Sequence, residues 1–189
     1  MTTTHDAHPD DAALEARVLA AVEAAGGADE VMRIDPALAD TAEFCAAYGW
    51  PMEASANCIV VASRDDEPVV AACLALATTR LDVNGTVRRL LGVRKLSFAP
   101  AELTMARTGM RIGGVTPFGL PEGLAVYADA RLVELERIIV GGGSRAVKLV
   151  VSPQVLAAAG VTFVPGLAKD AAPAGDAADT ADAADATDA

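Results

Sequence analysis

The stretch Gly113-Gly114-Val115-Thr116-Pro117-Phe118-Gly119 interrupts a chain that otherwise follows ordinary helix and strand patterns. Adjacent glycines leave backbone N–H groups open to close approach, and Pro117 fixes its own φ, lacks an N–H and biases Thr116 away from helix. These properties predict a loop that binds with its backbone. A tight connection between two elements is the alternative.

A second glycine cluster, Gly141-Gly142-Gly143-Ser144-Arg145, leads into a β-rich run over residues 146–151. Sites tend to form where strands open into loops, at the rim of a sheet. We expect the two glycine clusters to meet at one such rim.

Apolar periodicity, turn residues and helix stop signals predict an order of elements that mixes helices with strands. Residues 56–63 and 69–77 are separated by a polar turn ending in Pro68, which is typical of an antiparallel hairpin. The expected fold is α+β: one mixed, mostly antiparallel, curved or barrel-like sheet flanked by helices. Helices are expected at 10–25, 40–48, 82–91, 100–108 and 153–159, and strands at 31–34, 56–63, 69–77, 94–98, 124–128, 137–140, 146–151 and 161–164.

Composition predicts a single domain over residues 10–168, with a disordered leader at 1–9 and a disordered Ala/Asp-rich tail at 169–189. No apolar run reaches the length of about 18 to 20 residues that a membrane span needs, and the polar start lacks signal-peptide features. We therefore expect a cytoplasmic protein without membrane contact. Cys45, Cys58 and Cys73 have no C-x-x-C spacing, which favours reduced thiols with a packing role.

The formal net charge of −11 argues at first against a nucleic-acid partner, but its distribution is uneven. Six aspartates lie after Lys169, in the tail. The segment 80–111 instead holds seven Arg or Lys residues against two acidic ones. This basic segment is a candidate surface for phosphates.

Both histidines, His5 and His8, lie in the leader. A flexible pair of imidazoles is a poor metal site, so no metal or cofactor is expected. A Ser-His-Asp or Cys-His mechanism is excluded unless the leader folds back. Hydrolysis would have to use a carboxylate, a lysine, backbone dipoles or the substrate itself.

Four stretches in order, ACLALAT at 72–78, LGVRKLSF at 91–98, GGVTPFG at 113–119 and GGGSRAVKL at 141–149, resemble the YbaK/EbsC family. This is the aminoacyl-tRNA editing domain that also occurs as an insertion in bacterial prolyl-tRNA synthetases, and the resemblance spans roughly residues 12 to 167. It implies a single α+β domain that binds the aminoacylated 3′ end of a mischarged tRNA and hydrolyses the ester.

The resemblance also implies a site. Gly113 to Pro117 falls on the family's G-x-x-x-P motif, whose backbone N–H groups hold the ester. The implied catalytic residues are Gly113, Gly114, Thr116, Pro117 and Asn57. The implied substrate-binding residues are Val115, Phe118, Gly142, Gly143, Ser144, Lys148 and Arg80.

Asn57 departs from the family pattern, because much of the family carries a lysine where this chain aligns Asn57. An amide exchanges hydrogen bonds but supplies no positive charge. Asn57 is a structural polar group, the mark of an altered substrate or rate, or a sign of binding without catalysis. Lys148 and Arg80 are candidates to restore the charge, with solvated surface charge as the alternative.

Two carboxylates, Asp82 and Asp129, are candidates to orient water, but a helix-capping role suits each better. The leading hypothesis is a free-standing trans-editing aminoacyl-tRNA deacylase. The main alternative is a non-catalytic module of the same fold that binds aminoacyl-tRNA, a small aminoacyl ligand or an aminoacyl-tRNA synthetase. A small-molecule acyl hydrolase using the same loop is a third possibility.

Overall fold

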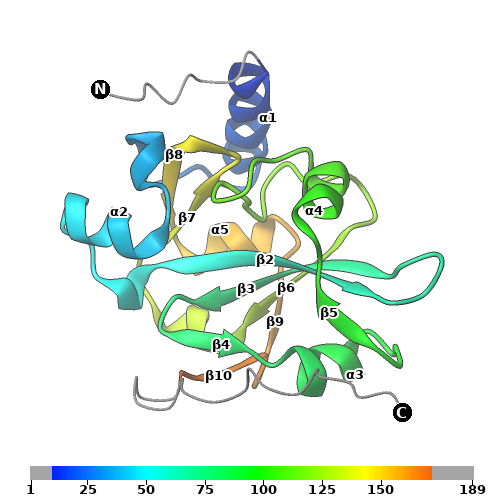
Figure 1. The fold of residues 1–189 in the computed structure, drawn as a ribbon. Helices are drawn as coiled ribbons and strands as arrows, with labels where there is room; N and C mark the ends of the chain where they lie inside the picture. The colour runs from blue at the N-terminus through cyan, green and yellow to red at the C-terminus, as the bar shows by residue number, and fades with distance from the viewer. Residues whose placement is uncertain (1–9, 172–189) are drawn as a thin grey trace, which may run out of the picture.

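The computed structural model describes residues 10–171, and its largest element is a five-stranded sheet with the order β5-β2-β3-β6-β9 (Figure 1). The predicted hairpin is confirmed, since β2 and β3 are antiparallel neighbours. β5 pairs antiparallel with β2, while β6 and β9 add in parallel on the other side. The strands are β2 (Ala56–Ser63), β3 (Val70–Leu76), β5 (Leu96–Phe98), β6 (Ala125–Asp129) and β9 (Thr162–Val164).

A second sheet has three antiparallel strands in the order β1-β8-β7, and a third pairs β10 with β4. A bridge between Ser55 and Ile139 joins the first two sheets beside β2 and β7. These strands are β1 (Glu30–Arg33), β7 (Ile138–Gly142), β8 (Ser144–Val151), β4 (Thr79–Leu81) and β10 (Ala168–Asp170). The mixed, mostly antiparallel α+β arrangement is confirmed, but residues 10–171 form three sheets instead of the one expected, and these sheets do not close into a barrel.

The helices follow the predicted stop signals, and α2 and α4 each end at a glycine with positive φ, Gly49 and Gly109. The α-helices are α1 (Asp11–Ala24), α2 (Thr41–Tyr48), α3 (Arg88–Leu90), α4 (Ala101–Thr108) and α5 (Pro153–Ala158). Shorter helical segments are η1 (Pro36–Leu38), η2 (Met52–Ala54), η3 (Val83–Val87) and η4 (Ala130–Glu134). The single helix expected after Asp82 is instead a π-helical turn, η3, followed by the short α3.

Asp82 and Asp129 both act as helix caps. Asp82 Oδ2 accepts the N–H of Thr86, and Asp129 Oδ1 accepts the N–H of Arg131. The expected capping role of both carboxylates is confirmed. Neither residue lines the main pocket described below.

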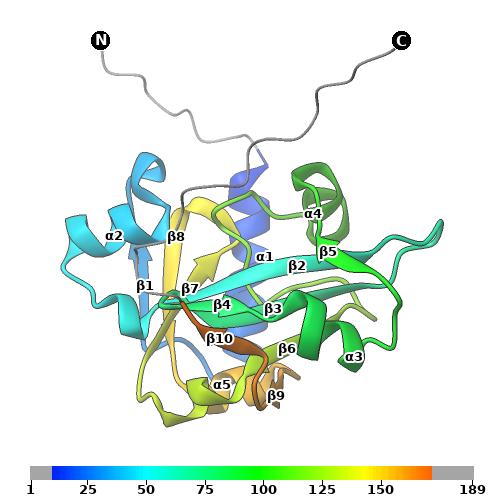
Figure 2. The ribbon, with the colours of Figure 1, turned by 60° about the horizontal axis from the view of Figure 1, so that its bottom comes forward.

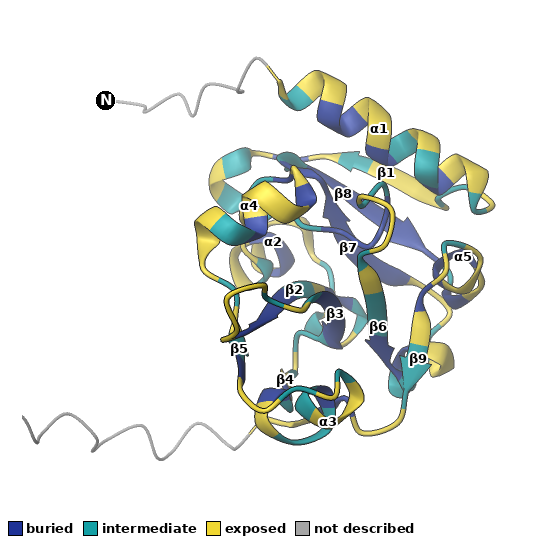
Figure 3. Cartoon of the chain, turned by 90° about the vertical axis from the view of Figure 1, so that its right-hand side faces the viewer, coloured by how far each residue is buried: buried dark blue, intermediate teal, exposed yellow. Residues whose placement is uncertain are grey.

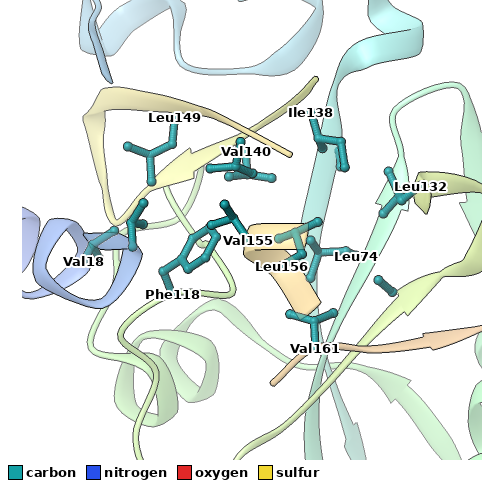
Figure 4. Packing of buried hydrophobic residues seen from close by; sticks show 14 of the residues in the cluster. Val18, Leu74, Phe118, Leu132, Ile138, Val140, Leu149, Val155, Leu156 and Val161 are labelled. Atoms are coloured by element: carbon teal, nitrogen blue, oxygen red, sulfur yellow. The ribbon is translucent and has the colours of Figure 1, made fainter. Parts of the chain in front are cut away.

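The main core lies between α1, α5 and the two larger sheets. Figure 4 shows Phe118 surrounded by side chains of this core, with Val18 of α1 and Leu149 of β8 nearby. Strands β2, β3, β7 and β8 are mostly buried, whereas α1 and α4 expose one face (Figure 3). Burial of this apolar surface is the main stabilising contribution.

The chain end is where the sequence prediction was incomplete. Residues Lys169 and Asp170 were assigned to the tail, but they form β10 with Ala168, beside β4 (Figure 2). Asp129 Oδ2 accepts the N–H of Ala168 at 2.7 Å, and Arg131 contacts Asp129, Asp170 and the Ala168 carbonyl. The leader with its two histidines and the tail after 171 lie outside the described residues.

Helices long and apolar enough to cross a lipid bilayer do not occur between residues 10 and 171.

Candidate functional site

A pocket of about 290 Å³ opens where the five-stranded and three-stranded sheets meet. Figure 1 shows α2 and α4 on the same side of β2, and both helices contribute to its wall. Its lining residues include Asp40, Thr41, Phe44, Asn57, Phe98, Ile112, Gly113, Val115, Gly141 and Lys148.

The two glycine clusters meet, as expected from the sequence. Gly143 N–H donates to the Gly114 carbonyl at 2.7 Å, and Arg111 N–H donates to the Gly143 carbonyl at 2.9 Å. A Cβ on Gly114 would lie 2.2 Å from the Ser144 carbonyl oxygen, and one on Gly141 would lie 2.5 Å from the Gly114 carbonyl oxygen. Backbone packs on backbone here, so any side chain at these positions would push the loops apart.

The backbone N–H groups of the loop are not equivalent. Gly114 N–H donates to the Arg111 carbonyl, Thr116 N–H points to Met110 Sδ, and Pro117 has no N–H. Within residues 10–171, the N–H groups of Gly113 and Val115 have no hydrogen-bond partner, and both residues line the pocket. These two donors are the ones left for a ligand.

Lys148 supplies a buried positive charge to the same pocket. Its side chain rises from β8 opposite Gly141, is 7% exposed, and places Nζ 5.5 Å from the centre of the Phe44 ring. Burial lowers the pKa of Lys148, an effect that nearby Asp40 opposes and Arg145 reinforces. Its ammonium makes no hydrogen bond or ion pair with any described residue. A largely buried cation that contacts an aromatic face but no described carboxylate is costly, and an anionic group in the pocket would satisfy it.

Asn57 lies at the start of β2, on the pocket wall. Its Oδ1 accepts a hydrogen bond from Thr41 Oγ1 at 2.7 Å, which fixes the amide orientation. This bond uses one of the two acceptor sites of Oδ1, while the NH₂ group donates to no residue between 10 and 171 and is available to a ligand. This arrangement suits a donor that places a carbonyl or hydroxyl oxygen.

Arg145, the last residue of the second glycine cluster, ties the loop to α2. Its Nε donates to the Pro36 carbonyl, and Nη1 donates to the Ile112 carbonyl at 3.3 Å. Both terminal nitrogens contact the Asp40 carboxylate at 3.4 Å. Asp40 occupies the N-cap position of α2, but its side chain caps no helix N–H because it pairs with Arg145 instead. The guanidinium therefore holds Gly113 at the pocket edge.

Ser144 lies behind the loop rather than in the pocket. Its Oγ donates to Glu15 of α1 and accepts the N–H of Ala146. Glu15 is buried and also pairs with Arg33 of β1. The hydroxyl thus anchors the second glycine cluster to the first helix.

The structure brings Asn57, Gly113, Val115 and Lys148 together on one pocket. It does not bring the other predicted site residues there. Six of them are buried and lie behind the pocket wall: Gly114, Thr116, Pro117, Gly142, Gly143 and Ser144. Phe118 points into the core. Arg80 is exposed on β4, opposite Lys169 of β10, and is not part of the pocket wall. Lys148 is therefore better placed than Arg80 to supply the missing charge.

Thr116 is one of these buried residues, and its hydroxyl has no hydrogen-bond partner among residues 10–171. A buried, unsatisfied hydroxyl costs free energy, which the surrounding packing of the loop must offset.

Thiol chemistry has no support at this site. Cys58 lines the pocket, but burial and then neighbouring Cys73 raise its pKa above the ordinary range. Burial also raises the pKa of Cys73 to about 12. Both thiols are protonated at neutral pH, which agrees with a packing role. Among residues 10–171 no group of three or more His, Cys, Asp and Glu side chains is placed to hold a metal ion.

Sequence reasoning missed Asp40, Thr41, Phe44, Phe98 and Arg145 as parts of the site. Arg145 ends a glycine cluster, and Phe98 closely follows Arg94 and Lys95, so both had a local signal. Asp40 and Thr41 look like ordinary helix-start residues, and only the fold shows that α2 begins at the pocket.

Comparison with known proteins identifies the family. The model of the aminoacyl-tRNA editing domain matches residues 35–159, which is most of the chain. The chain belongs to the aminoacyl-tRNA editing domain family. The match includes both glycine clusters, Asn57 and Lys148, and it begins after α1 and β1.

Solved structures of similar fold agree with this membership. One is a crystal structure of a candidate trans-editing enzyme for prolyl tRNA synthetase, with 25% identity, a TM-score of 0.69, and coverage of 85% of this chain and 98% of that one. Another, of a hypothetical protein, has 23% identity, a TM-score of 0.72, and coverage of 81% and 99%. The comparison with the second structure supports the shared fold and nothing about activity.

Proposed function

We propose that this editing-domain protein is a cytoplasmic trans-editing deacylase, which hydrolyses the ester of a mischarged aminoacyl-tRNA. One observation carries the proposal. Gly113 and Val115, whose backbone N–H groups have no partner among residues 10–171, line the same pocket as Lys148, whose ammonium forms no ion pair with a described residue. Three donors around one small pocket suit a substrate whose reacting carbonyl becomes an oxyanion.

The reaction needs little from the protein beyond placement and charge. Water adds its oxygen to the ester carbonyl carbon, and the carbonyl oxygen takes the negative charge. When the tetrahedral intermediate collapses, the bond from carbon to the ribose oxygen breaks, and that oxygen takes the proton lost by water. The products are the free amino acid and a tRNA with an unesterified 3′ end.

The loop donors and Lys148 have different roles in this scheme. Backbone N–H groups are fixed by the glycine packing, so they require no reorganisation when the oxyanion forms, and one such donor is worth about 3 to 4 kcal/mol. Lys148 adds a full charge in a low-dielectric wall, where its attraction to an oxyanion exceeds that in water. Its position on β8 would compensate for the uncharged Asn57.

Asn57 places the substrate in this proposal rather than activating water. The bond from Thr41 to Oδ1 orients the amide, and its NH₂ group donates to the aminoacyl group or the ribose. No histidine between residues 10 and 171 lines this pocket, and Asp40 pairs with Arg145 and is not free to act as a base. In this proposal the protein therefore orients the attacking water and does not deprotonate it.

The test is loss of amino acid from a panel of purified charged tRNAs that includes alanyl and cysteinyl tRNA-Pro. We expect accelerated release from at least one non-cognate pair, slowed about 10²-fold by Lys148→Met. Unchanged release across a full panel of charged tRNAs, with retained binding to a non-hydrolysable aminoacyl-RNA, would replace this proposal with the non-catalytic binding module. Release of simple esters as fast as charged tRNA would indicate a small-molecule acyl hydrolase.

A further inference from the structure

We propose that Phe98 is a stacking platform for the base of the 3′-terminal nucleotide of the tRNA. This inference rests on the proposed function, because it assigns a place to the nucleoside that carries the ester. It adds a binding subsite on the side of the pocket formed by β5.

Phe98 is an aromatic residue held rigidly at a sheet edge and left open. It is 55% exposed, it ends the edge strand β5, and it lines the pocket that also contains Gly113. Its backbone is opposite Val61 in the ladder, and the next residue donates its N–H to the Val60 carbonyl. Ring and cation–π contacts among the described residues involve Phe44, Tyr48, Trp50 and their neighbours, but not Phe98.

The surroundings of the ring are apolar on one side of the pocket. Ile112, directly before the ester loop, also lines the pocket and is 44% exposed. Two large apolar side chains exposed on one pocket mark a surface that a flat, apolar ligand face would cover. The faces of a nucleobase have this character, and stacking of a base on an aromatic side chain tolerates any base.

Positively charged residues flank Phe98 along the chain, which favours a nucleotide over other flat ligands. Arg94 and Lys95 precede β5 and are exposed, and Arg107 is exposed on α4, the helix that follows Phe98. None of the three forms an ion pair with a residue between 10 and 171. Exposed cations that flank an exposed aromatic residue along the chain suit single-stranded nucleic acid, which places its phosphates on cations and a base on a ring.

Covalent geometry then ties the base to the loop. The scissile ester and the terminal base are attached to the same ribose, so a base stacked at the pocket edge leaves the ester within reach of Gly113 and Val115. Phe98 and these two residues line one pocket, which is the juxtaposition the proposal requires.

The test compares binding of two short RNA hairpins by the full chain. Both imitate an acceptor stem ending in CCA and carry an amide-linked amino acid that is not hydrolysed, and one lacks the terminal base. Phe98→Ala should weaken binding of the complete probe on the order of 10-fold, as expected for loss of one base stack, and should leave the abasic probe unchanged. Phe98→Tyr should retain affinity for the complete probe. Phe98→Leu should show most of the loss of affinity that Phe98→Ala shows. Val133→Ala, an equally exposed apolar site on η4, is the matched control and should change neither probe.

Equal loss of affinity for both probes, or full binding by Phe98→Leu, would overturn the stacking assignment. Because the probes are not hydrolysed, this outcome is independent of catalysis. Deacylation by the wild-type chain together with unaffected binding by Phe98→Ala would defeat the subsite and leave the proposed function intact. If Phe98→Ala weakens binding of the complete probe only, while the wild-type chain deacylates no charged tRNA, the subsite stands and the proposed function fails.

Discussion

Gly143 donates its backbone N–H to the carbonyl oxygen of Gly114 across 2.7 Å, and this bond joins the ester loop to the turn between β7 and β8. The contact leaves no room for side chains, since a Cβ on Gly114 would overlap the Ser144 carbonyl. The position of the two free N–H donors is therefore set by the closeness of two backbones.

Gly114→Ala is predicted to lower stability and deacylation together. The new methyl group must displace the β7–β8 turn, which costs about 1 to 3 kcal/mol in unfolding free energy and moves Gly113 and Val115 out of register with the ester. Denaturant unfolding and single-turnover deacylation measure the two effects. Gly160→Ala is the control: that position has a positive φ but open space around it, so only backbone strain is added and deacylation should stay normal. Normal activity in Gly114→Ala would contradict the assigned role of the loop.

Lys148→Met is predicted to separate stability from activity. The substitution removes a buried, unpaired charge and keeps the volume, so unfolding free energy should be unchanged or higher. The deacylation rate constant should fall about 10²-fold, as for loss of an oxyanion-stabilising group. A variant as active as the wild type would assign Lys148 to structure alone.

The pH dependence of Lys148 follows from the same burial. Its pKa is lowered in the folded chain, so between that value and 10.5 the unfolded chain holds the extra proton. The destabilising effect of the charge is present at neutral pH and disappears as pH rises through this window. Deacylation that depends on the ammonium should decline at a lower pH than an ordinary lysine would allow, after the rate of uncatalysed hydrolysis is subtracted.

Asn57→Lys is predicted to rescue Lys148→Met. Both positions line the pocket, so an ammonium at 57 should restore at least a tenfold part of the lost rate if one cation suffices. In the wild-type background the same change should gain little, because two ammonium groups would then repel each other. Single-turnover rates of the four combinations form a double-mutant cycle, and additive effects would show that the two positions act independently.

Asp129→Asn is predicted to loosen the C-terminal strand. Burial opposes the charge of Asp129, but the Arg131 side chain and the N–H groups of Ala168 and Arg131 outweigh it, so the pKa lies below its ordinary value of 3.8. The stabilisation is complete above pH 3.8 and is lost as pH falls through the folded-state value. Loss of the charged hydrogen bonds should cost about 2 kcal/mol at neutral pH, with faster amide exchange at Ala168. Asp170→Asn, at an exposed partner of the same arginine, should cost under about 0.5 kcal/mol.

Features with local signals could be predicted from the sequence. The polar turn after Ser63 indicated the β2–β3 hairpin, and glycine clustering predicted that two distant loops meet. The sequence could name Lys148 and Arg80 as candidate cations. Only the fold shows that Lys148 is buried at the pocket and Arg80 is exposed, because burial depends on how the strands pack together.

Features set by tertiary contacts could not be predicted. Phe118 directly follows Pro117 in the loop, and a single apolar residue there has the same sequence pattern whether its side chain faces a ligand or the core. Asp40 has the spacing of a cap, yet the nearby Arg145 offers its carboxylate a charged partner instead. β10 was missed because Lys169 and Asp170 resemble the tail in composition, while their pairing depends on Asp129 and on β4.

The contact between Glu15 and Ser144 has a practical meaning for shortening the chain. The stretch that matches the family starts at residue 35. Glu15, Val18 and β1 precede this stretch, yet they pack against the back of the second glycine cluster and its strand. A protein trimmed to residues 35–159 would expose the Ser144 hydroxyl, uncover Val140 and Leu149, and give β8 a free edge. The portable unit for transplanting this pocket into another protein is therefore the segment from α1 to β10.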